Sequence, residues 1–206
     1  MTEPLGAAFF ARDVVDVARD LIGVTLRRGD VSLRITETEA YKWPPDTACH
    51  AKAGRTERTA PMFGPPGRAY VYLCYGIHNL LNLVTGEDGQ AQAVLIRACA
   101  PLKGLELVEE RRGGMKGIAL LDGPGKVGRA LALDTSWSHH DVTAPGGLEA
   151  LEGEPPSGLL AGVRIGIDYA LPEHRDLPWR FAEAGSRWVS RRKSLRPLDS
   201  VATMPA

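Results

Sequence analysis

Apolar and polar residues alternate with a period of two over much of this chain, the pattern of half-buried β-strands. Two pairs of such runs are joined by short glycine-containing turns, Gly29-Asp30 and residues 86–89, which predicts two β-hairpins. Pro101 is expected to end the second hairpin. The predicted strands are residues 24–28, 31–41, 69–74, 80–85, 91–98, 163–169 and 179–182.

Helical periodicity is confined to three short segments, residues 12–22, 104–112 and 125–133. Two further stretches, residues 42–67 and 143–158, are rich in Gly and Pro and are expected to be irregular. Strands joined by short turns, with helices in separate blocks, are typical of an α+β domain built on a curved antiparallel sheet.

Length and composition fit a single domain over residues 1–206, with a disordered tail expected from about residue 200. Apolar residues make up 44% of the chain, enough for a core, and no run of them is long enough to span a membrane. The start of the chain lacks the pattern of a signal peptide, and the three cysteines suggest free thiols in a reducing compartment. We therefore expect a cytoplasmic monomer, or a nuclear one if the source is eukaryotic.

The strand at residues 31–41 carries two carboxylates where apolar side chains are expected. Simple alternation places Glu37 and Glu39 on the face that begins with Val31, Leu33 and Ile35. A buried carboxylate is costly unless it is paired or hydrogen-bonded. The strand therefore predicts a site, although periodicity does not choose between the two acids.

Arg97 is the natural partner for these acids. It follows Ala93 and Leu95 on one apolar face of its strand, and a buried guanidinium needs an anion. The simpler interpretation is a structural ion pair. The functional one is that Arg97 keeps a carboxylate ionised, as a general base requires.

Three tyrosines lie within six residues and suggest a surface for nucleic-acid bases. Tyr70 and Tyr72 share a strand face, whereas Tyr75 precedes Gly76 at the expected turn. Tyrosine favours strands, so ordinary packing is the simpler explanation. Flat rings also stack on bases, and a tyrosine at a turn can enter a duplex as a wedge. The basic run at residues 187–196, which holds no acid, would support DNA binding if it is more than a solvated surface.

The segment Gly123-Pro-Gly-Lys126 is too incomplete for a phosphate loop, but Lys126 at a helix start could bind one backbone phosphate. His50 could be a base, a metal ligand or a stacking partner. The five histidines form no paired metal-ligand motif, so no structural zinc is expected.

Several motifs in a fixed order give the chain a clear resemblance to one family. They are Glu37-Thr-Glu39-Ala-Tyr41 with His50, Met62-Phe63, residues 67–76, Asn82, residues 95–98, Gly123-Pro-Gly-Lys126 and residues 163–166. In these the chain resembles the mammalian-type alkyladenine DNA glycosylases, also called methylpurine or 3-methyladenine DNA glycosylases. The resemblance runs from about Leu21 to Trp188 and implies a mixed α/β domain with a curved antiparallel sheet, flanking helices and a protruding β-hairpin.

The resemblance assigns roles to individual residues. It implies that Glu39 is the catalytic base and that Arg97 helps to hold the attacking water. Residues in contact with the extruded base would be Tyr41, His50, Tyr72, Asn82 and Leu95, with Asn82 excluding the guanine 2-amino group. Tyr75 would fill the vacated stack, and contacts with the DNA backbone would come from Arg55, Ile77, His78 and Lys126.

The activity implied is monofunctional excision of damaged purines from double-stranded DNA, with no cofactor and no strand cleavage. The substrates would be 3-methyladenine and 7-methylguanine, with hypoxanthine and ethenoadenine as further candidates. His78 departs from the family, whose members often carry an aromatic residue there, and residues 52–59 differ in length and include Glu57. Two alternatives remain open: a non-catalytic nucleic-acid-binding module, and a metal-dependent hydrolase using Glu37, Glu39 and His50.

Overall fold

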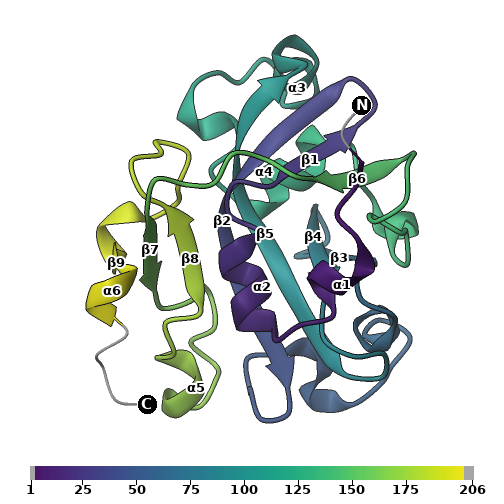
Figure 1. The fold of residues 1–206 in the computed structure, drawn as a ribbon, viewed down its shortest axis with the longest axis vertical. Coiled ribbons are helices and arrows are strands. Elements are labelled where there is room, and N and C mark those ends of the chain that lie inside the picture. The colour runs from purple at the N-terminus through teal and green to yellow at the C-terminus, as the bar shows by residue number, and fades with distance from the viewer. Residues whose placement is uncertain (1–2, 202–206) are drawn as a thin grey trace.

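A single nine-stranded antiparallel sheet organises the protein, seen here in a computed structural model that describes residues 3–201 (Figure 1). The main strand order is β3-β4-β5-β2-β8-β7-β9, and β1 pairs with both β2 and β6. The strands are β1 (Thr25–Arg28), β2 (Val31–Trp43), β3 (Ala69–Cys74), β4 (His78–Val84), β5 (Ala91–Lys103), β6 (Leu148–Leu151), β7 (Leu159–Gly162), β8 (Arg180–Glu183) and β9 (Arg196–Pro197). Together with the helices they confirm the predicted single mixed α+β domain.

Short helices surround the sheet in the described part of the chain. The α-helices are α1 (Ala7–Phe10), α2 (Val14–Asp20), α3 (Leu105–Arg111), α4 (Pro124–Ala130), α5 (Pro172–Arg175) and α6 (Leu198–Val201). The 3₁₀ helices are η1 (His50–Ala53), η2 (Ala60–Phe63), η3 (Ile118–Leu120), η4 (Thr135–Trp137) and η5 (Arg192–Ser194). The three predicted helical segments therefore exist, each a little shorter than its pattern.

The main core lies between the sheet and helices α2 and α4. Leu33, Leu83 and Ile96 from three strands are fully buried there. Helix α4 lies directly on β4, since a Cβ added at Gly128 would collide with the Asn79 carbonyl oxygen. Asp13 caps α2 by accepting a hydrogen bond from the Val15 amide (2.9 Å).

The pairing of β2 with β5 is irregular beside the two acids, and this overturns the simple alternation of the sequence. The register shifts on either side of Glu37. Ile35 and Ala40 both lie in the main core although their positions differ in parity, and the Thr38 hydroxyl donates to the Ala18 carbonyl of α2 (2.7 Å). The irregularity turns Glu37 and Glu39 away from the core face of Ile35, so they share a face with each other but not with the strand's first apolar residues.

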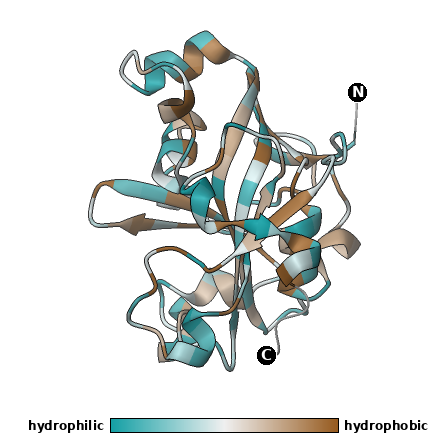
Figure 2. Ribbon diagram, turned by 90° about the vertical axis from the view of Figure 1, so that its left-hand side faces the viewer, coloured by the Kyte–Doolittle hydropathy of each residue, from teal (hydrophilic) through white to brown (hydrophobic). Residues whose placement is uncertain are grey.

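The hairpin formed by β3 and β4 projects from the body of the molecule (Figure 2). Its turn has left-handed backbone angles at Tyr75 (φ 51°) and Gly76 (φ 71°). The Tyr75 side chain is 91% exposed and that of Ile77 is 73% exposed. The predicted protruding hairpin is thus present, with its apolar tip in solvent.

Three local predictions are wrong. Strand β5 runs through Pro101 to Lys103. Strand β4 pairs with β5 only over Ala93–Leu95, so no second strand lies beside Pro101 to require its missing N–H. The segment 143–158 contains β6, which is buried and pairs with β1. The strand expected at 163–169 is a loop, and its neighbour β7 is the strand.

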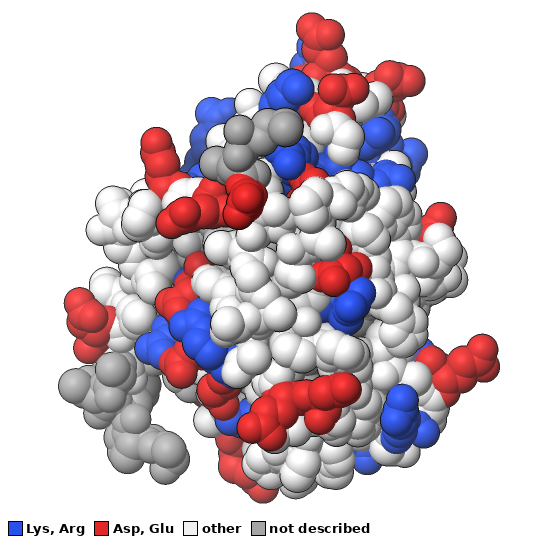
Figure 3. All heavy atoms as spheres, turned by 45° about the vertical axis from the view of Figure 1, so that its right-hand side comes forward, with Lys and Arg blue, Asp and Glu red and all other residues white. Residues whose placement is uncertain are grey.

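The predicted tail begins inside helix α6, which includes Ser200, while residues 202–206 lie outside the described residues. None of the described helices is long and apolar enough to cross a lipid bilayer. On the face in Figure 3, charged side chains of both signs are scattered around a largely uncharged centre. This agrees with the formal net charge of zero and shows no continuous basic surface on that side.

Candidate active site

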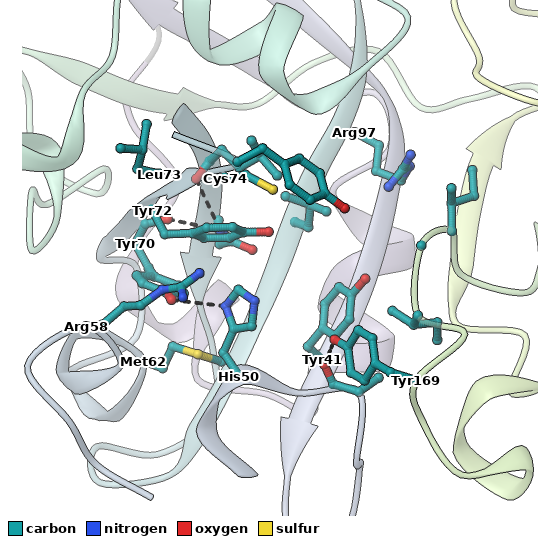
Figure 4. Close-up of a pocket in the computed structure, with 18 residues that line it drawn as sticks. Tyr41, His50, Arg58, Met62, Tyr70, Tyr72, Leu73, Cys74, Arg97 and Tyr169 are labelled. Carbon is teal, nitrogen blue, oxygen red and sulfur yellow. Dashed lines mark hydrogen bonds between the residues drawn. The ribbon is translucent and has the colours of Figure 1, made fainter. Parts of the chain in front are cut away.

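A cavity of about 420 Å³ lies where the β3–β4 hairpin, β5 and β2 meet the loop at residues 163–169. Figure 4 shows tyrosines on two sides of it and Arg97 at one end. The predicted base-binding residues Tyr41, His50, Tyr72, Asn82 and Leu95 all line this cavity. The structure therefore brings together side chains that are more than fifty positions apart in the sequence.

Glu39 is fully buried and held by three donors. Its Oε2 accepts hydrogen bonds from the Tyr41 hydroxyl (2.7 Å) and from Arg97 NH1 (3.1 Å). Its Oε1 accepts one from the Ile165 amide (2.8 Å). These donors fix the orientation of the carboxylate, as a general base requires.

Arg97 lies between the two acids and is 8% exposed. Its Nε is 3.6 Å from Glu37 Oε1, and its NH1 contacts Glu39. Burial alone would lower the pKa of Arg97, but attraction to Glu39 and Glu37 raises it above the ordinary value. Arg97 is therefore a permanent positive charge beside the catalytic candidate.

Glu37 belongs to a separate network behind Arg97. It accepts hydrogen bonds from Arg180 NH1 (3.0 Å) and from both the amide (2.7 Å) and the hydroxyl (2.9 Å) of Ser190. Burial raises the pKa of Glu37, an effect opposed by Arg97, Ser190 and Arg180. Neither acid is itself among the residues that line the cavity, but Tyr41, Arg97 and Ile165, which hold Glu39, all line it. Ser190 and Arg180, which hold Glu37, do not, so Glu37 lies one layer further from the cavity.

One wall of the cavity is aromatic, with the Arg58 guanidinium beside its rings. The Tyr70 and Tyr72 rings lie 5.5 Å apart, and the His50 ring meets that of Tyr72 edge-on at 4.5 Å. His50 Nδ1 is hydrogen-bonded to the Tyr70 hydroxyl (3.2 Å). Burial, together with Arg58 and Lys52, lowers the pKa of His50 to about 4. The imidazole is therefore neutral at physiological pH.

The opposite wall contains Tyr41 and Tyr169 (Figure 4). The Tyr169 hydroxyl donates to the Ala48 carbonyl (2.8 Å). Arg164 lies against the Tyr41 ring at 4.7 Å and is paired with Asp46 (2.5 and 2.9 Å). These contacts fix Tyr41 from behind, so both walls are held rigidly before any base enters.

Asn82 and Leu95 line the inner part of the cavity as a cross-strand pair of β4 and β5. The Asn82 side-chain amide donates to the carbonyls of Tyr70 (3.1 Å) and Leu80 (3.3 Å). This fixes the orientation of Asn82 and leaves its bulk in the cavity, as exclusion of an extra amino group on a base would require.

The residues predicted to contact DNA lie at or outside the mouth. Tyr75 lines the rim, whereas Arg55, Ile77, His78 and Lys126 do not line the cavity. His78 packs against the start of α4 beside Gly125, and Lys126 is hydrogen-bonded to Asp122 (2.6 Å). Arg55 lies over the Phe63 ring at 6.0 Å. Their roles toward DNA stay predictions.

Several residues of the site escaped the sequence reasoning. The Ile165 amide carries no sequence signal, because a backbone donor has no side-chain identity. Arg164 does carry one: like Arg97 it interrupts an apolar run, and it is 4% exposed. Arg58, whose guanidinium lies 5.4 Å from the Tyr72 ring centroid, comes from the irregular segment 42–67, where periodicity gives no guidance.

The geometry does not favour the metal-dependent alternative. The oxygens of Glu37 and Glu39 accept hydrogen bonds from protein donors, and Arg97 places a positive charge between them. His50 is engaged with Tyr70. Within residues 3–201, no three His, Cys, Asp or Glu side chains are grouped as metal ligands.

A buried carboxylate held by residues that line a base-sized aromatic cavity, beside a projecting hairpin, defines a DNA glycosylase, a hydrolase that acts on N-glycosyl bonds in DNA repair. Residues 8–187 match the family described as methylpurine-DNA glycosylase, and the chain belongs to that family. This confirms the resemblance found in the sequence.

Two relatives illustrate the match. The chain is 60% identical over 197 residues to a Nitrosococcus oceani protein named "Putative 3-methyladenine DNA glycosylase", covering 96% of this chain and 98% of the relative. It is 54% identical over 193 residues to an Arabidopsis thaliana protein named "DNA-3-methyladenine glycosylase", covering 92% of this chain and 76% of the relative.

Proposed function

We propose that this protein excises alkylated purines, 3-methyladenine and 7-methylguanine first among them, from double-stranded DNA by a single hydrolytic step. The observation that carries the proposal is the fully buried Glu39 carboxylate, held by Tyr41, Arg97 and the Ile165 amide at a cavity walled by aromatic rings. Hypoxanthine and ethenoadenine are further candidate substrates.

The damaged nucleotide first leaves the duplex, which costs roughly a few kcal/mol. The exposed Tyr75 ring, on its projecting turn, offsets this cost by entering the space that the base vacates. The extruded base then stacks in the cavity between Tyr72 and Tyr41, with His50 at its edge. This sequence of events explains why the hairpin tip and the cavity belong to one site.

Selectivity for alkylated purines follows from charge. Alkylation of a ring nitrogen makes the base cationic, and a cation over an aromatic face gains about 0.5–2 kcal/mol. A protonated His50 would repel such a base, but the pKa of His50, lowered to about 4, keeps the imidazole neutral. The neutral His50 therefore adds no positive charge to those of Arg58 and Arg97, which also line the cavity.

Hydrolysis is assigned to a water activated by Glu39. The carboxylate accepts a proton from this water, which attacks the anomeric carbon as the N-glycosidic bond breaks, and its negative charge stabilises the oxocarbenium-like sugar. Arg97 positions the carboxylate. The described residues that line the cavity include no lysine that could form a Schiff base, which supports a reaction that leaves the DNA strand intact.

The test is release of methylated purine from alkylated duplex DNA in the presence of a metal chelator. We expect the wild-type protein to release free base and Glu39→Gln to lose about 10²–10⁴-fold in rate while still binding the lesion. Inhibition by the chelator would favour the metal hydrolase. Binding without release by the wild-type protein would favour a non-catalytic module, and normal excision by Glu39→Gln would sink the assignment.

A further inference from the structure

A second cleft of about 500 Å³ lies on the other side of the loop that holds Glu39. Its walls are residues 163–166 and residues 191–194. Ile165 and Gly166 line both this cleft and the active-site cavity. A ligand in the cleft would therefore touch the same loop whose Ile165 amide is bonded to the catalytic carboxylate.

The two walls of the cleft are tied together by the buried Arg180. Its guanidinium donates to the Val163 carbonyl (2.9 Å) on one wall and to the Ser194 hydroxyl (2.6 Å) on the other. It also donates to Glu37 (3.0 Å). The Ser194 carbonyl lies so close to Gly162 that an added Cβ there would come within 2.6 Å of it. The cleft is a fixed part of the fold.

The charge of the cleft is positive. Arg191, Arg192 and Lys193 line it, and Asp168 is the one acid among the described lining residues. Arg164 also lines the cleft, but its charge is neutralised by Asp46. The Arg192 guanidinium donates to the Ser186 carbonyl (2.9 Å). Within the described part of the chain, the exposed side chains of Arg191 and Lys193 have neither a hydrogen-bond nor an ion-pair partner.

We propose that this cleft binds a phosphate group of the DNA backbone next to the extruded nucleotide, through Arg191 and Lys193. The inference rests on the proposed function, since it requires a nucleotide in the cavity. When the base fills the cavity, its sugar and phosphates lie at the mouth, and the exposed Gly166 is common to both openings. A strand leaving the mouth on this side passes two unpartnered cations.

The site also connects the backbone to the chemistry. Arg191 directly follows Ser190, whose amide and hydroxyl hold Glu37, and Glu37 contacts Arg97. A phosphate at Arg191 would be one residue away from this network. This placement separates a phosphate site from an ordinary solvated basic segment, which would have no fixed relation to the active centre.

The first experiment measures binding of the wild-type protein and of the Arg191→Gln/Lys193→Gln double variant to a lesion-containing duplex over a range of salt concentrations. Each lost phosphate contact reduces the slope of log affinity against log salt by about 1, so we expect a reduction of about 2. Lys116→Gln is the control, because Lys116 is an exposed lysine that follows α3 and does not line the cleft, and its slope should match the wild type.

The second experiment replaces single phosphates of the lesion strand with neutral methylphosphonates. Replacement at one or two positions near the lesion should weaken binding of the wild-type protein several-fold. The same replacements should not change binding of the double variant. Equal losses in both proteins at every position, or an unchanged salt slope, would overturn the site. If the wild type bound lesion DNA and released base while the variant matched it in both experiments, this inference alone would fail, and the proposed function would stand.

Discussion

The Tyr41 hydroxyl donates a 2.7 Å hydrogen bond to Oε2 of Glu39, two residues earlier on the same strand. Residues two positions apart on a strand point to the same face, so the strand that carries Glu39 also carries the donor that orients it. Burial and the neighbouring Glu39 raise the pKa of Tyr41 well above its ordinary value, so the phenol keeps its proton and remains a donor.

Tyr41→Phe should slow excision about tenfold to a hundredfold, because a hydrogen bond to a charged group contributes about 1.5–3 kcal/mol. The ring remains, so affinity for lesion DNA should change little. Single-turnover rates and equilibrium binding with the same duplex separate these effects. Equal rates for Tyr41→Phe and the wild type would show that the hydroxyl does not orient Glu39.

Tyr75→Ser should weaken binding to lesion DNA about tenfold to a hundredfold, since stacking of a base on an aromatic ring contributes ~1–3 kcal/mol. The Tyr75 side chain is 91% exposed, so the free energy of unfolding should stay within about 0.5 kcal/mol of the wild type. Binding isotherms and chemical denaturation check both parts. An unchanged affinity would remove the wedge.

His50 should make stability depend on pH on the acid side. Burial, with Arg58 and Lys52, lowers its pKa from 6.5 to about 4, so the unfolded chain binds a proton in that window that the folded protein does not. Above pH 6.5 the neutral His50 does not reduce the free energy of unfolding. As the pH falls from 6.5 toward 4, the free energy of unfolding decreases by up to about 3 kcal/mol.

Denaturation of the wild type and of a His50→Asn variant between about pH 4 and pH 8 measures this contribution. The difference between their unfolding free energies should vary with pH only in the acid part of the range. His139→Asn is a suitable control, because His139 is exposed and its left-handed backbone (φ 70°) accepts asparagine. A flat difference for His50→Asn would mean that His50 is not held neutral by the fold.

Glu37→Gln should destabilise the protein by about 3–5 kcal/mol, because it leaves the fully buried Arg180 without its counter-charge. The exposed Glu152→Gln should cost no more than about 0.5 kcal/mol. Urea denaturation of both variants provides the comparison. A loss as small as that of Glu152→Gln would show that the Glu37 pair is not structural.

The sequence was sufficient for the elements that depend on local pattern. Strand β3 was predicted over its full length because its pattern ends at Tyr75-Gly76, whereas the protruding hairpin was expected from the family resemblance alone. Arg97 was predicted to pair with the acids of β2 because each interrupts an apolar strand, and the structure places it 3.6 Å from Glu37 and 3.1 Å from Glu39. Electrostatic need was enough to predict this contact, but the choice of Glu39 over Glu37 came from the family resemblance.

The remaining parts of the site depend on distant partners. The loop at 163–166 alternates like a strand, but the Ile165 amide is bonded to Glu39 and Arg164 to Asp46, so its backbone is held by the site instead of a ladder. The irregularity near Glu37 arises from two strands together. Neither feature is encoded in a window of neighbouring residues, and periodicity could not reveal them.

The bonds from Ser190 to Glu37 set a limit on how far the chain can be shortened. The match to the family ends at residue 187, three positions before Ser190, and would suggest that the later residues are dispensable. Cutting there would remove β9, α6 and both Ser190 donors to Glu37. The C-terminal residues therefore act at the centre of the molecule, although they lie beyond the segment that matches the family.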